Sequence, residues 1–386
     1  KLLTVSSDGA AADEARRVGV RLDYLMAVAR LGQEKPREGR EWADRAIESA
    51  REIDDWSTLI RALNAMDFAE QALGRSGIGE HTREALEIAM AHGDAPQESV
   101  ARANLGVLAF YAGRWAEAVE WLTSSSRVAI EAGNDFGAAE TDLTYADILI
   151  HQGRLDEAES VLSNASRVLR ATGIEDFAAH AQVLQARIHR ARGELAEAAE
   201  QAAAAVAVYQ EMGSAVDALE ASIVSAEVAI EAGDPQEALA IVEDAQEATQ
   251  GEGASLEARS QVVRGRALLA LDRLDDAGVA IEAGIAAARD QDLPFELALL
   301  LRLRSHWRRR GAGGGDAGAL AVDEAASADA AEAARLLSVL GARVCRRPPV
   351  GSPRSGVSAQ PNKEWPPVAR RATGGHRLAP VPAGVE

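Results

Sequence analysis

The sequence predicts an all-α fold, a right-handed superhelical solenoid of antiparallel helix pairs with a repeat of about forty residues. Three observations predict it: turn residues recur at a fixed spacing, apolar residues between the turns follow a helical period, and the composition favours helix. Hydrophobic residues make up 47% of the chain but aromatic residues only 4%. The core must therefore consist mostly of Ala, Leu, Val and Ile, in a chain whose many Ala, Glu and Arg residues favour helix.

The spacing of the turns is the main signal. The segment Ala-Gly-Arg-Trp-Ala-Glu-Ala, which ends at Ala118, is echoed by Gln-Gly-Arg-Leu-Asp-Glu-Ala, which ends at Ala158. The turn residues of this series lie 40, 40, 40 and 39 positions apart, at Gly113, Gly153, Gly193, Gly233 and Asp272. A second series, also spaced by 40, consists of Gly93, Gly133, Gly173, Gly213 and Gly253. Because a Gly just past a helix supplies the left-handed residue that ends it, the two series divide each repeat into two helices of roughly 15–18 residues.

The residues between the turns indicate how the helices pack. One apolar stripe at helical spacing consists of Leu155, Ala158, Val161, Leu162, Ala165 and Leu169. Small residues recur in the first helix of each pair at Gly106, Ala146, Ala186 and Ala226, and in the second at Ala118, Ala158, Ala198 and Ala238. Small side chains let two antiparallel helices approach closely, while Leu122, Leu162 and Val242 fill the seam. A single pair cannot bury both its faces, so each pair is expected to stack on the next.

Extending the spacing outward, through Gly74 and Gly32 on one side and Gly311 on the other, gives about eight helix pairs between residues 10 and 340. The expected order along the chain follows from this. It is an irregular N-terminal helix pair or cap (1–55), the repeat array (56–310), a Gly-rich linker (311–318), a C-terminal capping helix (319–341) and a tail (342–386).

The tail differs from the rest of the chain in composition. Eight of the twelve prolines lie beyond Gly341, and no amphipathic period continues there, which predicts disorder. Residues 342–386 contain eight Arg or Lys and two Glu, a charge of +6. Because the whole chain has a net charge of −19, residues 1–341 have a net charge of −25. An out-of-frame reading of a GC-rich gene is a second explanation of this Arg-, Pro- and Gly-rich composition.

Charge and composition also exclude several classes of function. A strongly acidic chain is a poor match for nucleic acid, which needs a basic surface. Cys345 is the only cysteine, which excludes an intramolecular disulfide and a multi-cysteine zinc site. No apolar run reaches the roughly 18–20 residues that span a bilayer, and no signal peptide is recognisable. We therefore expect a cytoplasmic protein with no membrane partner, and the absence of an initial Met suggests a processed product or a fragment.

No motif for catalysis or cofactor binding is found. The three lysines, Lys1, Lys35 and Lys363, do not lie in a phosphate-binding loop. His180 and His189 are nine positions apart, which does not place two metal ligands on one helix face. Most paired carboxylates lie in first turns of the expected helices, where they complement the helix dipole. The sequence thus predicts no catalytic residue, no cofactor and no metal, and the chain itself is not expected to be an enzyme.

The remaining candidate is the inner surface of the solenoid. In a right-handed stack the first helix of each pair lines the concave face, where residues outside the seam meet a partner. By register these partner-binding candidates are Phe110, Tyr111, Glu140, Asp147, His151, His180, Arg187, Arg190, Glu220, Glu227 and Glu231. Aromatic and charged side chains together suit a peptide groove, whereas Trp115 and Trp121 are assigned to packing or to the convex side.

The spacing of Leu105-Gly106, Gly113-Arg114-Trp115, Ala118 and Leu122 resembles the signature of tetratricopeptide repeats. The period departs from the family, being 40 rather than the usual ~34 residues, and most of the consensus Trp and Tyr residues are missing. The resemblance implies a helical solenoid that binds proteins or peptides.

A narrower resemblance covers roughly residues 40–341. Trp56 to Leu73, Gly79 to Leu86 and Asn104 to Trp115 look like the C-terminal repeats of actinobacterial class III adenylate/guanylate cyclases. In that family a cyclase domain and a P-loop ATPase module precede the array. Similar arrays end large ATPase regulators that carry a LuxR-type helix-turn-helix. Neither resemblance brings catalytic residues, because neither catalytic segment is present.

Together these observations predict a non-catalytic protein–protein interaction scaffold, the regulatory or sensor arm of a larger cytoplasmic signalling protein of the cyclase or ATPase type. Its partner is expected to be a protein, a peptide or a domain of the same parent protein. The alternative is the repeat arm of a LuxR-type transcriptional regulator that lacks its DNA-binding domain. An enzyme would need a composite site that no motif indicates.

Overall fold

A computed structural model describes residues 9–75, 79–311 and 316–343. These residues form sixteen α-helices and one short 3-10 helix, and no strand occurs among them. The helices are α1 (Gly9–Leu31), α2 (Pro36–Glu52), α3 (Trp56–Ala72), α4 (Glu80–His92), α5 (Ala95–Tyr111), α6 (Trp115–Glu131), α7 (Asp135–His151), α8 (Leu155–Thr172), α9 (Glu175–Arg192), α10 (Leu195–Met212), α11 (Ala215–Ala232), α12 (Pro235–Ala248), α13 (Glu257–Ala270), α14 (Leu274–Asp290), α15 (Pro294–Gly311) and α16 (Asp316–Leu340).

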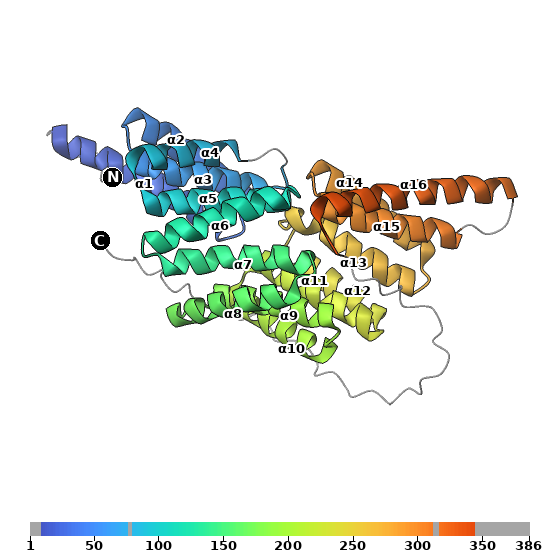
Figure 1. Cartoon of the computed structure of the whole chain (residues 1–386). Coiled ribbons are helices and arrows are strands. Elements are labelled where there is room, and N and C mark those ends of the chain that lie inside the picture. Colours follow the sequence, from blue (N-terminus) through green and yellow to red (C-terminus); the bar gives the residue numbers. More distant parts are fainter. Residues whose placement is uncertain (1–8, 76–78, 312–315, 344–386) are drawn as a thin grey trace. The chain divides into compact units, whose positions relative to one another are not determined.

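Each helix packs against the next one along the chain, and each odd-numbered helix also contacts the next odd-numbered helix. The odd-numbered helices therefore form one continuous row, which we call the inner row, and the even-numbered helices lie outside it (Figure 1). This arrangement confirms the predicted all-α solenoid of helix pairs.

The turns follow the predicted spacing with one exception. A left-handed backbone, with φ between 67° and 96°, occurs at Gly93, Gly113, Gly133, Gly153, Gly173, Gly193, Gly213 and Gly233, and Asp272 adopts it with φ 60°. The prediction for Gly253 is wrong, because its φ is only 4°. Since α12 already ends at Ala248, Gln250 and Gly251 take the left-handed conformation there, and Gly253 instead precedes the 3-10 helix Ala254–Leu256.

The two helices of each pair lie close together, as the small residues at their interface predicted. Ala118, Ala158, Ala198 and Ala238 are completely buried. At Gly106 a Cβ atom would lie 2.6 Å from Cγ of Leu122, a distance that only a residue without a side chain tolerates. Close approach of the backbones thus replaces the bulky aromatic residues that this sequence largely lacks.

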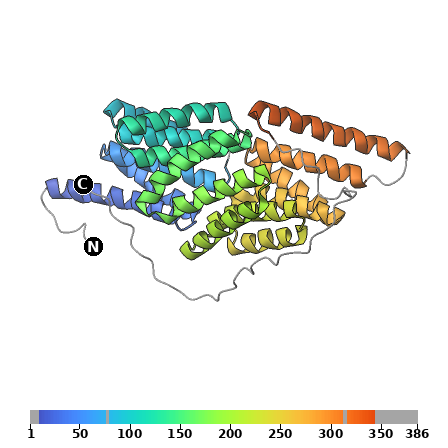
Figure 2. The ribbon, with the colours of Figure 1, turned by 60° about the horizontal axis from the view of Figure 1, so that its bottom comes forward.

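The inner row bends far enough for distant repeats to meet. Leu340 at the end of α16 packs with Trp115 and Ile148, and the backbone N–H of Arg343 donates to the carbonyl of His151. On another side, the Glu34 carboxylate accepts hydrogen bonds from the first two backbone N–H groups of α11, at 3.0 and 2.7 Å. Figure 2 shows the same helices from a second direction.

The helix at the C-terminal end begins at Asp316, three residues before the expected start of the capping helix at 319. Arg304 and Arg308 of α15 hold it through Asp329, with N–O distances of 2.7 Å. Residues 312–315 of the Gly-rich linker and, from residue 344 on, the tail lie outside the described residues. Along the described helices there is no stretch long and apolar enough to cross a bilayer.

Candidate functional site

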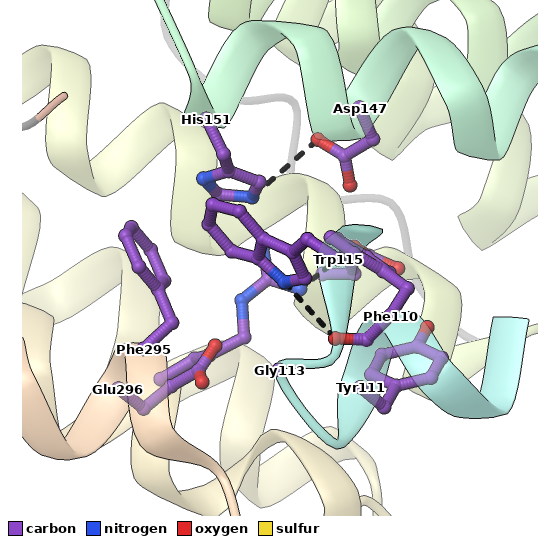
Figure 3. A pocket seen from close by; sticks show the side chains of 10 residues that line it. Phe110, Tyr111, Gly113, Trp115, Asp147, His151, Phe295 and Glu296 are labelled. Carbon is purple, nitrogen blue, oxygen red and sulfur yellow. Dashed lines mark hydrogen bonds and ion pairs between the residues drawn. The ribbon is translucent and has the colours of Figure 1, made fainter. Parts of the chain in front are cut away.

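A cavity of about 30 Å³ lies where five helices of the inner row converge. One side is aromatic and the other is polar. Figure 3 shows the lining, which consists of Phe110, Tyr111, Gly113, Trp115, Asp147, His151, Glu220, Arg259, Phe295 and Glu296. This volume holds a few water molecules, so a peptide cannot enter unless the walls move.

The aromatic wall joins α5, α6 and α7 to α15. The Trp115 ring, on a residue that is 3% exposed, lies 5.4 Å from the ring of Phe295, and His151 meets the same Phe295 edge-on at 4.6 Å (Figure 3). The Trp115 indole N–H donates to the carbonyl of Phe110 at 3.1 Å. Aromatic pairs of this kind contribute about 0.5–1.5 kcal/mol each beyond the area they bury. Phe295 thereby connects the last repeat to repeats about 180 residues earlier.

The polar wall is a chain of ion pairs across the inner row. Arg187, which is 4% exposed, donates to both carboxylate oxygens of Asp147 at 2.7 Å and to Glu220 at 2.8 Å. Arg259 donates to the same Glu220 oxygen at 2.8 Å. Acidic and basic side chains therefore alternate along this series of ion pairs, from Asp147 on α7 through Arg187 on α9 and Glu220 on α11 to Arg259 on α13.

A second group of ion pairs lies beside the first on the same helices. Arg190 contacts Glu227 at 3.1 Å and Glu231 at 3.0 Å. Arg266 approaches the same two carboxylates at 3.5 and 3.7 Å. Like the first group, it connects neighbouring repeats. Arg266 follows Glu227 by 39 positions, so the two residues occupy nearly equivalent positions in successive repeats.

These contacts shift the pKa values of the carboxyl groups in opposite directions. Burial alone would raise the pKa of Glu220, but Arg259 and Arg187 together lower it well below its usual range. The pKa of Asp147 is lowered in the same way, mainly by Arg187. Burial raises the pKa of Glu296, and the attraction of Arg259 offsets this only in part.

His151 gives this site a pH dependence. Burial lowers its pKa to about 4, although Asp147 lies 3.6 Å away and acts in the opposite direction. Below the ordinary pKa of ~6.5 the unfolded chain binds a proton that the folded chain does not, so stability is lost as the pH falls from there towards 4.

We expect this loss to disappear in His151→Gln. Between about pH 7.5 and about pH 4.5, wild type should lose about 2 kcal/mol more of its unfolding free energy than the variant does. Urea denaturation at both pH values measures this difference. The shifts of the surrounding carboxyl groups are common to both proteins and largely cancel, so an equal pH dependence would contradict the assignment.

The structure places all eleven residues predicted for partner binding on the inner row. Phe110 and Tyr111 lie on α5, Glu140, Asp147 and His151 on α7, His180, Arg187 and Arg190 on α9, and Glu220, Glu227 and Glu231 on α11. They differ in accessibility, however. Arg187 is buried, whereas Glu140 and Tyr111 are exposed. Most of the charged residues contact one another.

Other residues of the site were missed. Arg259 follows Glu220 by 39 positions, so extending the register one repeat further would have found it. Trp115 is indeed a packing residue, but it also lines the cavity. Phe295 and Glu296 had no comparable signal, because their position depends on how far the row bends.

A second group of polar residues lies apart from the cavity, between α3 and α4. Asp67, Glu70 and His81 have ligand-type atoms within 4.8 Å of one another. Asp67 is 1% exposed and accepts hydrogen bonds from the backbone and hydroxyl of Thr82, both at 2.8 Å, which caps the start of α4. Two arginines, Arg40 and Arg75, already contact Glu70. Their charges oppose a bound cation, so capping accounts for the cluster.

Solved structures with similar folds include two complexes, one with a peptide and one with a factor. A Rap protein complexed with competence and sporulation factor superposes with a TM-score of 0.60 at 12% identity, covering 85% of this chain and 91% of the other. NprR in complex with its cognate peptide NprX superposes with a TM-score of 0.55 at 16% identity, covering 81% and 89%. At these identities the likeness shows a shared fold.

No curated protein matches the chain in sequence. The model of one family does match, over residues 59–306, which is more than half of the chain. This segment runs from α3 to α15 and includes the helices that line the cavity. The chain belongs to the family described as the MalT-like TPR region.

Proposed function

We propose that the chain is a non-catalytic regulatory arm of a larger cytoplasmic signalling protein, and that it binds a peptide or a protein segment along the inner row. The observation that carries the proposal is the cavity, where four aromatic residues face a set of partly buried charges that ion pairs hold in place. Rigid aromatic rings and fixed charges together are the usual means of binding a peptide in a groove. The two fold neighbours support this proposal, because one is complexed with its cognate peptide and the other with competence and sporulation factor.

Binding is expected to change the curvature of the solenoid. Phe295 lines the cavity and contacts Trp115, and its neighbour Pro294 lies against the turn at Gly113, so the last repeat bounds one side of the cavity. A ligand that enters between these groups separates α15 from α5 and α6. The movement would be passed to a neighbouring domain of the parent protein, which gives a physical route from binding to regulation.

The kind of parent protein rests on the resemblance to the cyclase and ATPase arrays. A cyclase or ATPase domain encoded upstream of this segment supports that parent. A helix-turn-helix domain encoded downstream supports the alternative of a LuxR-type regulator.

Binding to the inner row can be tested with a matched pair of charge reversals. Glu140→Lys changes an exposed residue of the inner helix α7, and Glu200→Lys changes an exposed residue of the outer helix α10. Peptides are selected from a random display library with the full chain, and their affinities for both variants are measured by fluorescence anisotropy. We expect Glu140→Lys to weaken binding at least about tenfold, roughly 1.4 kcal/mol, and Glu200→Lys to leave it unchanged. Equal affinities for both variants, or no selected peptide, would contradict the proposal.

A further inference from the structure

The polar side of the cavity has more acidic than basic groups. Its lining contains one guanidinium group, that of Arg259. It contains three carboxyl groups, those of Asp147, Glu220 and Glu296. His151 adds no charge at neutral pH, because its pKa is lowered to about 4. A group that enters this cavity therefore meets an excess of carboxyl groups, which attract a cation and repel an anion.

The arginines at the cavity do not remove this excess. Arg259 donates to Glu220 at 2.8 Å. Arg187, which is not part of the lining, donates to Asp147 and to the same Glu220 oxygen. Two guanidinium groups thus serve three carboxyl groups. Glu296 is compensated least, since its pKa is raised whereas the pKa values of the other two are lowered.

The charged groups further along the inner row cancel one another. Two carboxylates are paired there with two guanidinium groups, namely Glu227 and Glu231 with Arg190 and Arg266. Arg343 is exposed, and its side chain lies against the turn at Gly153, where water screens its charge. The excess of one carboxyl group at the cavity therefore remains.

The aromatic side of the cavity suits a cation as well. It consists of Phe110, Tyr111, Trp115 and Phe295. The face of an aromatic ring carries negative partial charge, so it attracts a cation. The indole N–H of Trp115 does not offer a donor to an anion, because it is already bonded to the carbonyl of Phe110 at 3.1 Å. Figure 3 shows the two sides meeting, with Phe295 and Glu296 both reaching the site from α15.

The volume of the cavity selects a compact cation. About 30 Å³ holds a few water molecules. The nitrogen and adjacent carbon of an ammonium group are of this size, whereas the planar guanidinium group is larger. An ammonium group also has three donors that point in different directions, which suits carboxyl groups supplied by three different helices.

We propose that the cavity binds one ammonium group, with its nitrogen at the three carboxyl groups and its carbon stem against the aromatic side. The inference rests on the proposed function, because the peptide or protein segment on the inner row supplies the ammonium, from a lysine or from an N-terminus. The nitrogen and adjacent carbon fit the cavity as it stands. The chain that follows them is what moves the walls.

Small amines test the inference without a peptide. Butylammonium represents a lysine side chain and glycinamide an N-terminus, and n-butanol is the uncharged counterpart of the first. The full chain is labelled with fluorotryptophan, and the fluorine NMR resonance of Trp115 is identified by its loss in Trp115→Phe. At constant ionic strength we expect at least one amine to shift this resonance with a Kd of about 1–10 mM, and the amine that binds more tightly identifies the source.

The uncharged and the larger compounds provide the comparison. We expect n-butanol to bind at least about tenfold more weakly than butylammonium, because it lacks the charge that the carboxyl groups attract. No shift with either amine, or equal binding of butylammonium and n-butanol, overturns the inference. Tighter binding of methylguanidinium than of both amines overturns the choice of an ammonium group.

A matched pair of variants tests the role of Glu296. Glu296→Gln removes the carboxyl group at nearly constant size, and Glu200→Gln makes the same change on the outer helix α10. Butylammonium should bind Glu296→Gln at least about tenfold more weakly than wild type, with unchanged helix content by circular dichroism. Glu200→Gln should bind it as wild type does. Equal affinity for the two variants overturns the assignment.

The amine titrations and the peptide selection fail independently. Selected peptides that bind the inner row of a chain whose Trp115 resonance no amine shifts support the proposed function and overturn the ammonium site. Binding of an amine in the absence of any selected peptide supports the ammonium site and contradicts the proposed peptide ligand.

Discussion

Replacement of Arg187 with methionine is expected to lower the free energy of unfolding by about 3–5 kcal/mol. The guanidinium is buried between α7 and α11 and donates to Asp147 and Glu220. Methionine fills similar space but donates no hydrogen bond, so Asp147 is left as a charge without its main partner in a poorly hydrated position. The penalty comes mostly from that abandoned carboxylate, because breaking a buried ion pair costs far more than forming it gains.

Two controls separate this effect from the loss of any arginine. Arg127→Met removes an exposed pair with Glu131, in which both side chains are more than 60% exposed, and should cost no more than about 0.5 kcal/mol. Adding Asp147→Asn to Arg187→Met should recover part of the lost stability, since it removes the unpaired charge. Urea unfolding followed by circular dichroism measures all four proteins. If Arg187→Met and Arg127→Met lower the free energy of unfolding by similar amounts, the ion pairs of Arg187 are not buried in solution.

Much of the fold could be predicted because repetition makes the sequence redundant. The left-handed residue at Gly113 is difficult to recognise alone, but its recurrence at Gly153, Gly193 and Gly233 reveals a helix end in each repeat. Where the chain departs from the period, the prediction is wrong. Gly253 kept the spacing, yet α12 ends early and the turn forms at Gly251 instead.

The inner row could be predicted as a set, but not the accessibility of its members. Register places Asp147 and Arg187 on equivalent sites of adjacent repeats, which correctly assigns both to one face. Whether they meet a ligand or each other depends on the distance between α7 and α9, which the register does not give. The same 40-residue offset that suggested a binding surface also brings opposite charges within 2.7 Å.

The cavity itself depends on accumulated curvature, which no local pattern records. Phe295 reaches Trp115 only because each repeat adds a small rotation to the last. Small changes in each repeat would move α15 away from α6.

The contact that closes the cavity can be tested at Gly113, and Gly113→Ala is expected to cost about 2–5 kcal/mol. Gly113 has φ 70°, and any other residue in this conformation is destabilised by about 1–2 kcal/mol. A Cβ atom there would also lie 2.1 Å from Cγ of Pro294, so either α15 or the turn must move, which adds about 1–3 kcal/mol. Gly133 has nearly the same φ, 74°, but a Cβ atom at this position meets nothing within 4 Å.

Gly133→Ala therefore isolates the cost of the backbone conformation, and the difference between the two variants measures the closing contact. Urea unfolding gives both values, and equal losses would show that α15 does not rest on this turn in solution.

The same pair of variants bears on ligand binding. If a peptide can enter only after α15 moves, the ligand-free protein must be opened at a cost that weakens the apparent affinity. In Gly113→Ala the added methyl group already weakens the contact between α15 and the turn, so less free energy is needed to open the cavity. Gly113→Ala should therefore bind a selected peptide more tightly than Gly133→Ala does, although it is the less stable protein.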